Sequence, residues 1–295
     1  MDKITEPAQP EHVRTGKEKN AHTGLKPLLS KFRTDYFSTL WVIYTKEFRG
    51  YICVPFGWVI LACTMGIQAL ILQSVMEIMM NATGNSVMFY MTDSLLFLML
   101  FIFIFPLITM RSFAEEERLG TLEGLLTVPV TTSQILLGKY LAAYTFYLII
   151  WLPMLLYPWM SSIGNFYTEL RYGEHCSTTI NYLLADWVGA YSILALTGAF
   201  FVALGILCSS VTRSQIISAI FCTCLMIMYY FMGRVTELWG EFPAAPIFHY
   251  ISYSEQFRSF TSGVLDTRPL VLYVSLTICI LAITKHIVDY RRWTR

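Results

Sequence analysis

Six long stretches without a charged side chain constrain this chain more than any other feature of its sequence. They span residues 50–76, 94–110, 140–168, 187–212, 214–233 and 269–284. Each can hold one helix of about 17 to 25 residues, the length that the hydrocarbon core of a bilayer requires. We therefore expect an all-α polytopic membrane protein with six transmembrane helices. The last stretch is the shortest, and Lys285 is expected to extend it by snorkelling.

The scarcity of charge excludes several classes of function. Charged residues make up 14% of the chain, against about a quarter in ordinary soluble domains. Transporters coupled to ion gradients need ionisable groups at membrane depth, and none lies within the six stretches. The five histidines are dispersed, and the H-E-x-x-H and G-x-S-x-G motifs are absent. We therefore expect no enzymatic activity, no catalytic residue and no bound cofactor.

Metal, nucleotide and nucleic-acid binding receive no support either. Cys222 and Cys224 form a C-x-C pair, but they point about 200° apart around a helix, so no metal site is expected. The net charge of +1 gives no sign of a nucleic-acid partner. The phosphate-binding motif G-x-x-x-x-G-K-[ST] is absent. If ATP powers this protein, another polypeptide must bind the ATP.

The distribution of lysine and arginine predicts how the chain crosses the membrane. With a cytoplasmic N-terminus, 17 of these residues fall on the inside. Only four fall on the outside: Arg171, Arg234, Arg258 and Arg268. We therefore expect both termini in the cytoplasm.

Residues 111–139 carry the most specific signal, because they place an acidic turn and a short amphipathic helix between two spans. Thr121 can cap a helix over 122–127, and Pro129 ends it. Thr131 and Gln134 have the spacing of a capping box that opens the next span. This loop is therefore expected to be ordered and to receive a docking partner. Because it lies outside the hydrocarbon, reversing its charges is expected to cost little folding energy.

The amino-acid sequence of this loop resembles the first cytoplasmic loop of type-2 ABC exporter permeases. The matching residues are Arg111, Glu115, Glu116, Glu117, Gly120, Thr121, Leu122, Glu123, Leu125, Leu126, Pro129, Gly138 and Lys139. Residues 205–215, 257–266 and 290–293 also resemble that family, and permeases of the gliding-motility-associated ABC transporter group are the closest relatives in wording. The longer polar N-terminus and the loop at 169–179 depart from the pattern.

The resemblance implies a transmembrane permease subunit of an ATP-driven exporter in the bacterial inner membrane. Its partners would be a cytoplasmic ABC ATPase, a second permease as homodimer or heterodimer, and membrane lipids. The resemblance assigns coupling to the ATPase to Glu115, Glu116, Glu117, Gly120, Thr121, Leu122 and Glu123. A non-transporting membrane scaffold that recruits a cytoplasmic partner is the alternative, and a channel is a third possibility.

The chain divides into two parts, a tail and a permease domain. Residues 1–37 are polar with little periodicity, which predicts a disordered cytoplasmic tail. Residues 38–295 would form the permease domain, and its first segment, 38–52, has the pattern of a helix in the inner membrane interface. Residues 247–260 are spaced for a surface or re-entrant helix.

Few polar side chains occur within the spans, and two of them share a helical face. Thr64 and Gln68 are four residues apart in the first span. Buried amides usually make interhelical hydrogen bonds worth about 1 kcal/mol. The two interpretations of Thr64 and Gln68 are therefore a packing contact between helices and the lining of a substrate route.

Overall fold

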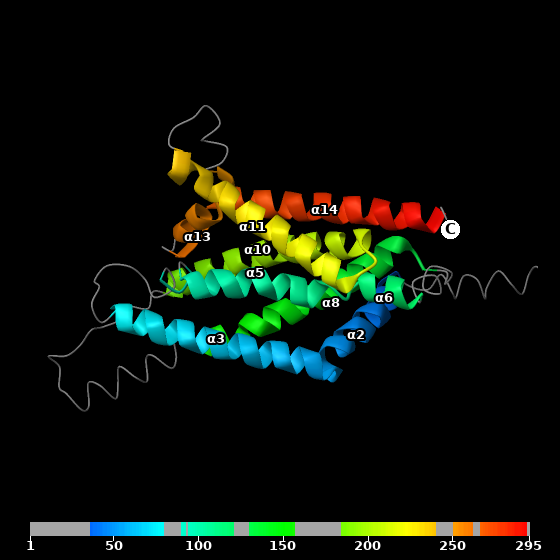
Figure 1. Ribbon diagram of the computed structural model, residues 1–295, viewed down its shortest axis with the longest axis horizontal. Helices are drawn as coiled ribbons and strands as arrows, with labels where there is room; N and C mark the ends of the chain where they lie inside the picture. Colours follow the sequence, from blue (N-terminus) through cyan, green and yellow to red (C-terminus); the bar gives the residue numbers. More distant parts are fainter. Residues whose placement is uncertain are drawn as a thin grey trace, which may run out of the picture.

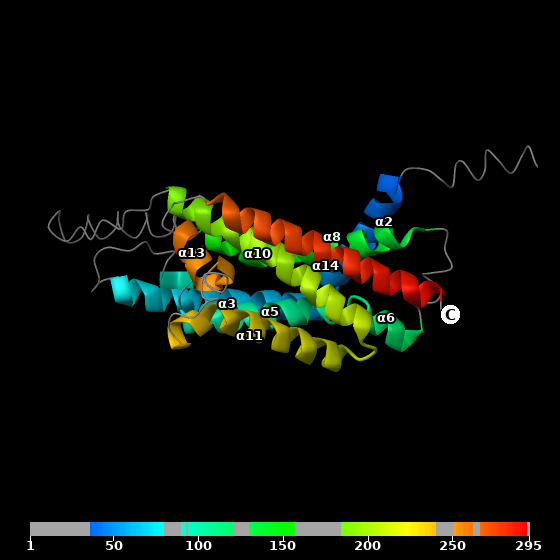
Figure 2. The ribbon, with the colours of Figure 1, turned by 90° about the horizontal axis from the view of Figure 1, so that it is seen from above.

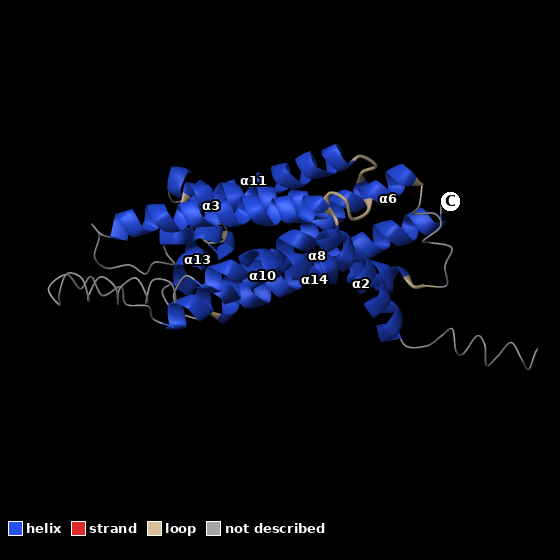
Figure 3. Cartoon of the chain, turned by 90° about the horizontal axis from the view of Figure 1, so that it is seen from below, coloured by secondary structure: helices blue, strands red, loops and turns tan. Residues whose placement is uncertain are grey.

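The computed structural model describes residues 36–79, 90–92, 94–120, 130–156, 184–239, 250–261 and 266–293. The elements in these ranges are helices, and no strand occurs among them (Figure 3). In chain order they are α2 (Tyr36–Cys53), α3 (Pro55–Met79), α5 (Leu95–Thr109), α6 (Ala114–Leu119), α8 (Thr132–Trp151), the 3-10 helix η1 (Leu152–Leu156), α10 (Leu184–Val211), α11 (Gln215–Trp239), α13 (Tyr253–Thr261) and α14 (Thr267–Trp293). Six candidate membrane spans occur among the described residues: α3, α5 continued through α6 to Leu119, α8 continued through η1 to Leu156, α10, α11 and α14. The predicted all-α fold with six candidate spans is confirmed.

The transmembrane helices form two layers. Figure 1 labels these helices, and the turned view of Figure 2 shows α3, α5 and α11 on one side and α8, α10 and α14 on the other. More than half of the residues in the spans of α5, α8 and α10 are buried, against less than a third in those of α3, α11 and α14. The aromatic side chains of Phe105, Tyr147 and Phe201 join the two layers at the centre of the bundle. Large apolar faces of the outer helices are therefore left for lipid or another subunit.

Local sequence signals set several helix ends. Ser94 precedes α5, and its hydroxyl accepts a hydrogen bond from the Phe97 N–H at 3.1 Å. The predicted capping box at the start of α8 is confirmed, since the Thr131 N–H donates to Gln134 Oε1 at 3.0 Å. Both caps satisfy backbone groups that a helix end leaves free.

Several predicted span boundaries differ from the observed helices, and two of them show why. The third uncharged stretch begins at Tyr140, but α8 begins at Thr132 and includes Lys139. The sixth stretch ends at Thr284, but α14 continues to Trp293. A charged side chain limits where a chain can meet hydrocarbon, yet the helix continues because its backbone hydrogen bonds do not depend on side-chain charge.

Two helices outside the spans complete the described fold. Helix α2 confirms the helix expected over 38–52, begins at Tyr36, and packs against α8, where Tyr44 lies 3.4 Å from Thr145 Oγ1. Helix α13 covers only the second half of the stretch 247–260. Its Tyr253, Phe257 and Phe260 side chains are buried, so α13 belongs to the packed bundle. Residues 1–35 of the expected tail lie outside the described residues.

Candidate coupling site

The acidic run of the predicted loop forms a helix of its own. Glu115, Glu116 and Glu117 occupy the first turn of α6, where negative charge favours the positive end of the helix dipole. Gly120 ends the helix with φ of 70°, a left-handed conformation that suits glycine. Thr121, Leu122 and Glu123, and the helix expected over 122–127, lie outside the described residues.

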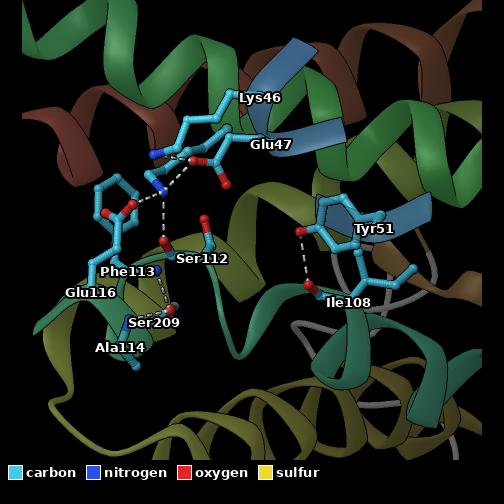
Figure 4. A network of polar contacts seen from close by, with 10 residues as sticks. Lys46, Glu47, Tyr51, Ile108, Ser112, Phe113, Ala114, Glu116 and Ser209 are labelled. Atoms are coloured by element: carbon cyan, nitrogen blue, oxygen red, sulfur yellow. Dashed lines mark hydrogen bonds and ion pairs between the residues drawn. The ribbon is translucent and has the colours of Figure 1, made fainter. Parts of the chain in front are cut away.

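A side chain from another helix holds the start of α6. Ser209 of α10 is fully buried, and its Oγ lies 3.0 Å from both the Phe113 and the Ala114 backbone nitrogens (Figure 4). The hydroxyl thus accepts two N–H groups that have no partner within α6. Its own hydrogen lies within reach of the Met110 carbonyl oxygen at 3.4 Å. The start of α6 is therefore attached to α10.

Lys139 is the centre of a buried charge cluster. Its ammonium lies 2.8 Å from Glu116 Oε1, 3.0 Å from Glu47 Oε1 and 2.9 Å from the Ser112 carbonyl oxygen. The side chain is only 2% exposed. All three ammonium hydrogens therefore have acceptors, and the cluster joins α2, α6 and α8. Figure 4 shows Glu47, Ser112 and Glu116 converging on this point.

Glu117 forms a second cluster on the other side of α6. Its side chain is 4% exposed and accepts from Arg291 Nη1 at 3.2 Å, and Arg213 Nε lies 3.4 Å away. Arg291 also donates to the Val211 carbonyl oxygen at 2.9 Å. Glu117 therefore joins α6 to α14 and to the turn between α10 and α11.

These contacts correct the expectation that charge reversal in this loop costs little folding energy. Glu116 pairs with Lys139, and Glu117 pairs with Arg291. Removing one partner of a buried ion pair costs about 3–5 kcal/mol. The expectation remains open for Glu115, because no ion pair to it occurs among the described residues.

Sequence reasoning did not find Glu47, Ser209 or Arg291 as members of this site. They are separated from α6 by tens of residues, so no local spacing connects them. Lys139 is among the residues that resemble the family's first cytoplasmic loop, and it bounds the third uncharged stretch. A lysine within an otherwise apolar helix was the available signal, because a buried ammonium needs acceptors.

Comparison with known protein families decides the identity of this bundle. Residues 62–263 match the family described as ABC-2 family transporter protein. The chain belongs to the ABC-2 transporter family. It is the membrane permease, and the ATP is bound and used by a separate ATPase subunit. No curated protein matches the sequence.

The match covers α6 and most of the spans of this ABC-2 permease, but one member of each charge cluster lies beyond it. Glu47 of α2 precedes the matched residues, and Arg291 of α14 follows them. The acidic helix inside the family region is thus held partly by the flanking helices.

The other predicted site of the permease lies between α3 and α8. Gln68 is 1% exposed, and its Nε2 donates to the Ile150 carbonyl oxygen at 3.2 Å. Thr64 is also buried, and its hydroxyl donates to Leu61 within its own helix at 2.9 Å. Gln68 Oε1 is buried without a hydrogen-bond partner among the described residues. The contact to Ile150 is of the kind that the packing interpretation predicts.

Proposed function

We propose that this ABC-2 permease is the membrane subunit of an exporter whose α6 segment receives the force generated by a cytoplasmic ABC ATPase. The observation that carries the proposal is the double attachment of α6, through Glu116 to Lys139 and through Glu117 to Arg291. A push on α6 is transmitted through these pairs to α2, α8 and α14.

The ATPase contact is assigned to the outer side of the same segment. Glu116 and Glu117 are occupied by internal partners, whereas Arg118 and Leu119 are exposed. Glu115, Leu119 and Gly120, with Thr121, Leu122 and Glu123 following, would supply the contact surface. Mixed apolar and charged surfaces of this kind suit recognition between proteins.

The charge distribution supports a cytoplasmic location of this end of the bundle. Arg111, Arg118, Arg213 and Arg291 all belong to segments at the α6 end, in agreement with the excess of positive charge on the inside. We therefore place both termini in the cytoplasm of a bacterial cell, with the permease in the inner membrane.

The outer faces of α3 and α11 are the proposed contact to a second permease, as homodimer or heterodimer. Leu70, Ile216 and Ile220 are among their exposed apolar side chains. A substrate route between the two subunits would pass near Thr64 and Gln68. We infer that the permease exports its substrate and belongs to the gliding-motility-associated group, because residues 111–139, 205–215 and 257–266 resemble such permeases in sequence.

Co-purification with the ATPase tests the coupling assignment. Glu115→Lys and Leu119→Asp are expected to reduce recovery of the ATPase and ATP-dependent transport without reducing membrane abundance. Arg49→Glu, a charge reversal at an exposed site on α2, is the control and should leave both unchanged. If the ATPase binds but the complex shows no ATP-dependent transport, the chain is a scaffold and not a transporting permease.

A further inference from the structure

A cavity of about 220 Å³ lies where α2, α3 and the end of α5 meet. Its lining residues are Glu47, Gly50, Tyr51, Val54, Phe56, Gly57, Leu107, Arg111, Ser112 and Glu115. Sites for drug-sized ligands are usually larger, about 300–1,000 Å³. The cavity therefore suits a small polar group and not a whole substrate of that size.

Two of its polar groups have hydrogen-bonding capacity left. Ser112 is 4% exposed, and its Oγ has no hydrogen-bond partner among the described residues. Arg111 has its guanidinium carbon 4.2 Å from the centre of the Phe56 ring, and its buried Nε has no acceptor in the described part of the chain. Tyr51 is already committed, since its hydroxyl donates to the Ile108 carbonyl oxygen at 3.0 Å (Figure 4). A buried donor without an acceptor is costly, so this arrangement indicates a ligand that accepts hydrogen bonds.

The same cavity also carries negative charge. Glu47 and Glu115 both line it, but Glu47 Oε1 is paired with Lys139 at 3.0 Å and lies 3.8 Å from Lys46, so Glu115 is the carboxylate without an ion pair among the described residues. A simple anion would be attracted by Arg111 but repelled by Glu115, and a simple cation would be attracted by Glu115 but repelled by Arg111. A ligand that satisfies both carries an anionic group and an ammonium a few bonds apart.

The surroundings of the cavity are those of a membrane boundary. Val54 and Leu107 line it and are 40% and 36% exposed. Phe103, one turn before Leu107 on α5, is 56% exposed, and Trp58 of α3 is 61% exposed. These side chains extend an apolar surface from the cavity along the span, and tryptophan is frequent at the level of lipid headgroups.

We infer that this cavity binds the phosphoethanolamine headgroup of a membrane phospholipid. The phosphate accepts hydrogen bonds from Arg111 and Ser112, the ammonium donates to Glu115 and Glu47, and the acyl chains lie along Leu107 and Phe103. The bound lipid would join α2 to the end of α5, because its headgroup contacts residues of both.

Lipid retention by the purified full-length chain tests this site. The detergent-solubilised protein is incubated with equal amounts of phosphatidylethanolamine and phosphatidylglycerol of identical acyl chains, and retained lipids are counted by native mass spectrometry. Wild type is expected to retain phosphatidylethanolamine in preference. Arg111→Gln is expected to lower that retention about tenfold, the effect of losing a hydrogen bond to a charged group. Ser112→Ala is expected to lower it by a smaller factor.

Arg118→Gln, which removes an exposed arginine of α6 outside the cavity, is the matched control and should retain lipid like wild type. Arg111→Lys keeps the charge and is expected to recover part of the retention, which separates binding from folding. Equal retention of both lipids, or a preference for phosphatidylglycerol, overturns the inference. Displacement of the lipid by soluble phosphoethanolamine at equal concentration would assign the site to a soluble phosphoamine and overturn its assignment to a lipid.

Discussion

Lys139 and Glu116, which are 23 residues apart in the chain, form an ion pair of 2.8 Å at the junction of α8 and α6. The lysine is buried, whereas the carboxylate is 17% exposed. The pair therefore closes the loop 117–138 at its base and fixes α6 against the helix that follows it.

The first prediction concerns this pair. Lys139→Met leaves Glu47 and Glu116 without their shared cation, and we expect the free energy of unfolding to fall by about 3–5 kcal/mol. Thermal unfolding of the detergent-solubilised chain measures the change. Lys139→Arg keeps the charge and should lose less.

A double-mutant cycle separates the pair from general packing. Glu116→Gln and Lys139→Met are each expected to lower stability, and the double variant is expected to lose less than the sum of the two single losses. If the double variant is as unstable as the sum of the single variants, the pair has no energetic coupling.

Ser209→Ala is expected to loosen α6. The substitution leaves the Phe113 and Ala114 N–H groups without their acceptor, at a cost of about 1–2 kcal/mol. Hydrogen exchange of the α6 amides should become faster. Ser210→Ala is the neighbouring control, because Ser210 Oγ donates only within its own helix, to Leu207 at 2.7 Å. Similar exchange in both variants would show that Ser209 does not hold α6.

The junction of α2 and α3 is expected to be intolerant of any side chain at Gly57. A Cβ there would overlap the Tyr51 carbonyl oxygen, a backbone atom that cannot move aside as a flexible side chain can. Gly57→Ala should therefore destabilise the chain by about 1–3 kcal/mol through overpacking. Gly66→Ala, in the same helix with nothing within 4 Å of its Cβ, should be neutral or stabilising by up to about 1 kcal/mol. Equal thermal stability of the two variants would contradict the observed packing.

Gln68→Leu distinguishes a substrate route from a packing contact. If Gln68 faces the route, turnover or substrate preference should change more than assembly does. Loss of the hydrogen bond to Ile150 alone should cost about 0.6 kcal/mol. Transport per assembled complex and the yield of the complex are the two measurements. Unchanged turnover with a lower yield would assign Gln68 to packing.

The proposed orientation is tested by cysteine labelling in a variant without native cysteines. Ser262→Cys should react with an impermeant thiol reagent in intact cells, and Thr121→Cys should react only after the membrane is opened. Labelling of Thr121→Cys from outside would reverse the topology.

The sequence alone determined the number of candidate spans and their helical type. Six long uncharged stretches suit membrane-spanning helices, because each helix satisfies its own backbone groups where hydrocarbon offers no partner. The capping box of Thr131 and Gln134 was equally readable, since both residues lie within one helical turn. The family pattern around Glu115 to Glu123 pointed to the correct class of transporter.

Only the tertiary structure decided what the charged residues do. Lys139 looked like the edge of a span and is the centre of a buried cluster, because Glu47, 92 residues earlier, reaches it from α2. Glu117 was expected to contact the ATPase, and it pairs instead with Arg291, 174 residues later in the same chain. Local sequence fixes helices through hydrogen bonds a few residues apart, but the partner of a buried charge depends on which helices pack together. Which helices pack together depends on the fit between whole helix surfaces, and no short segment contains that information.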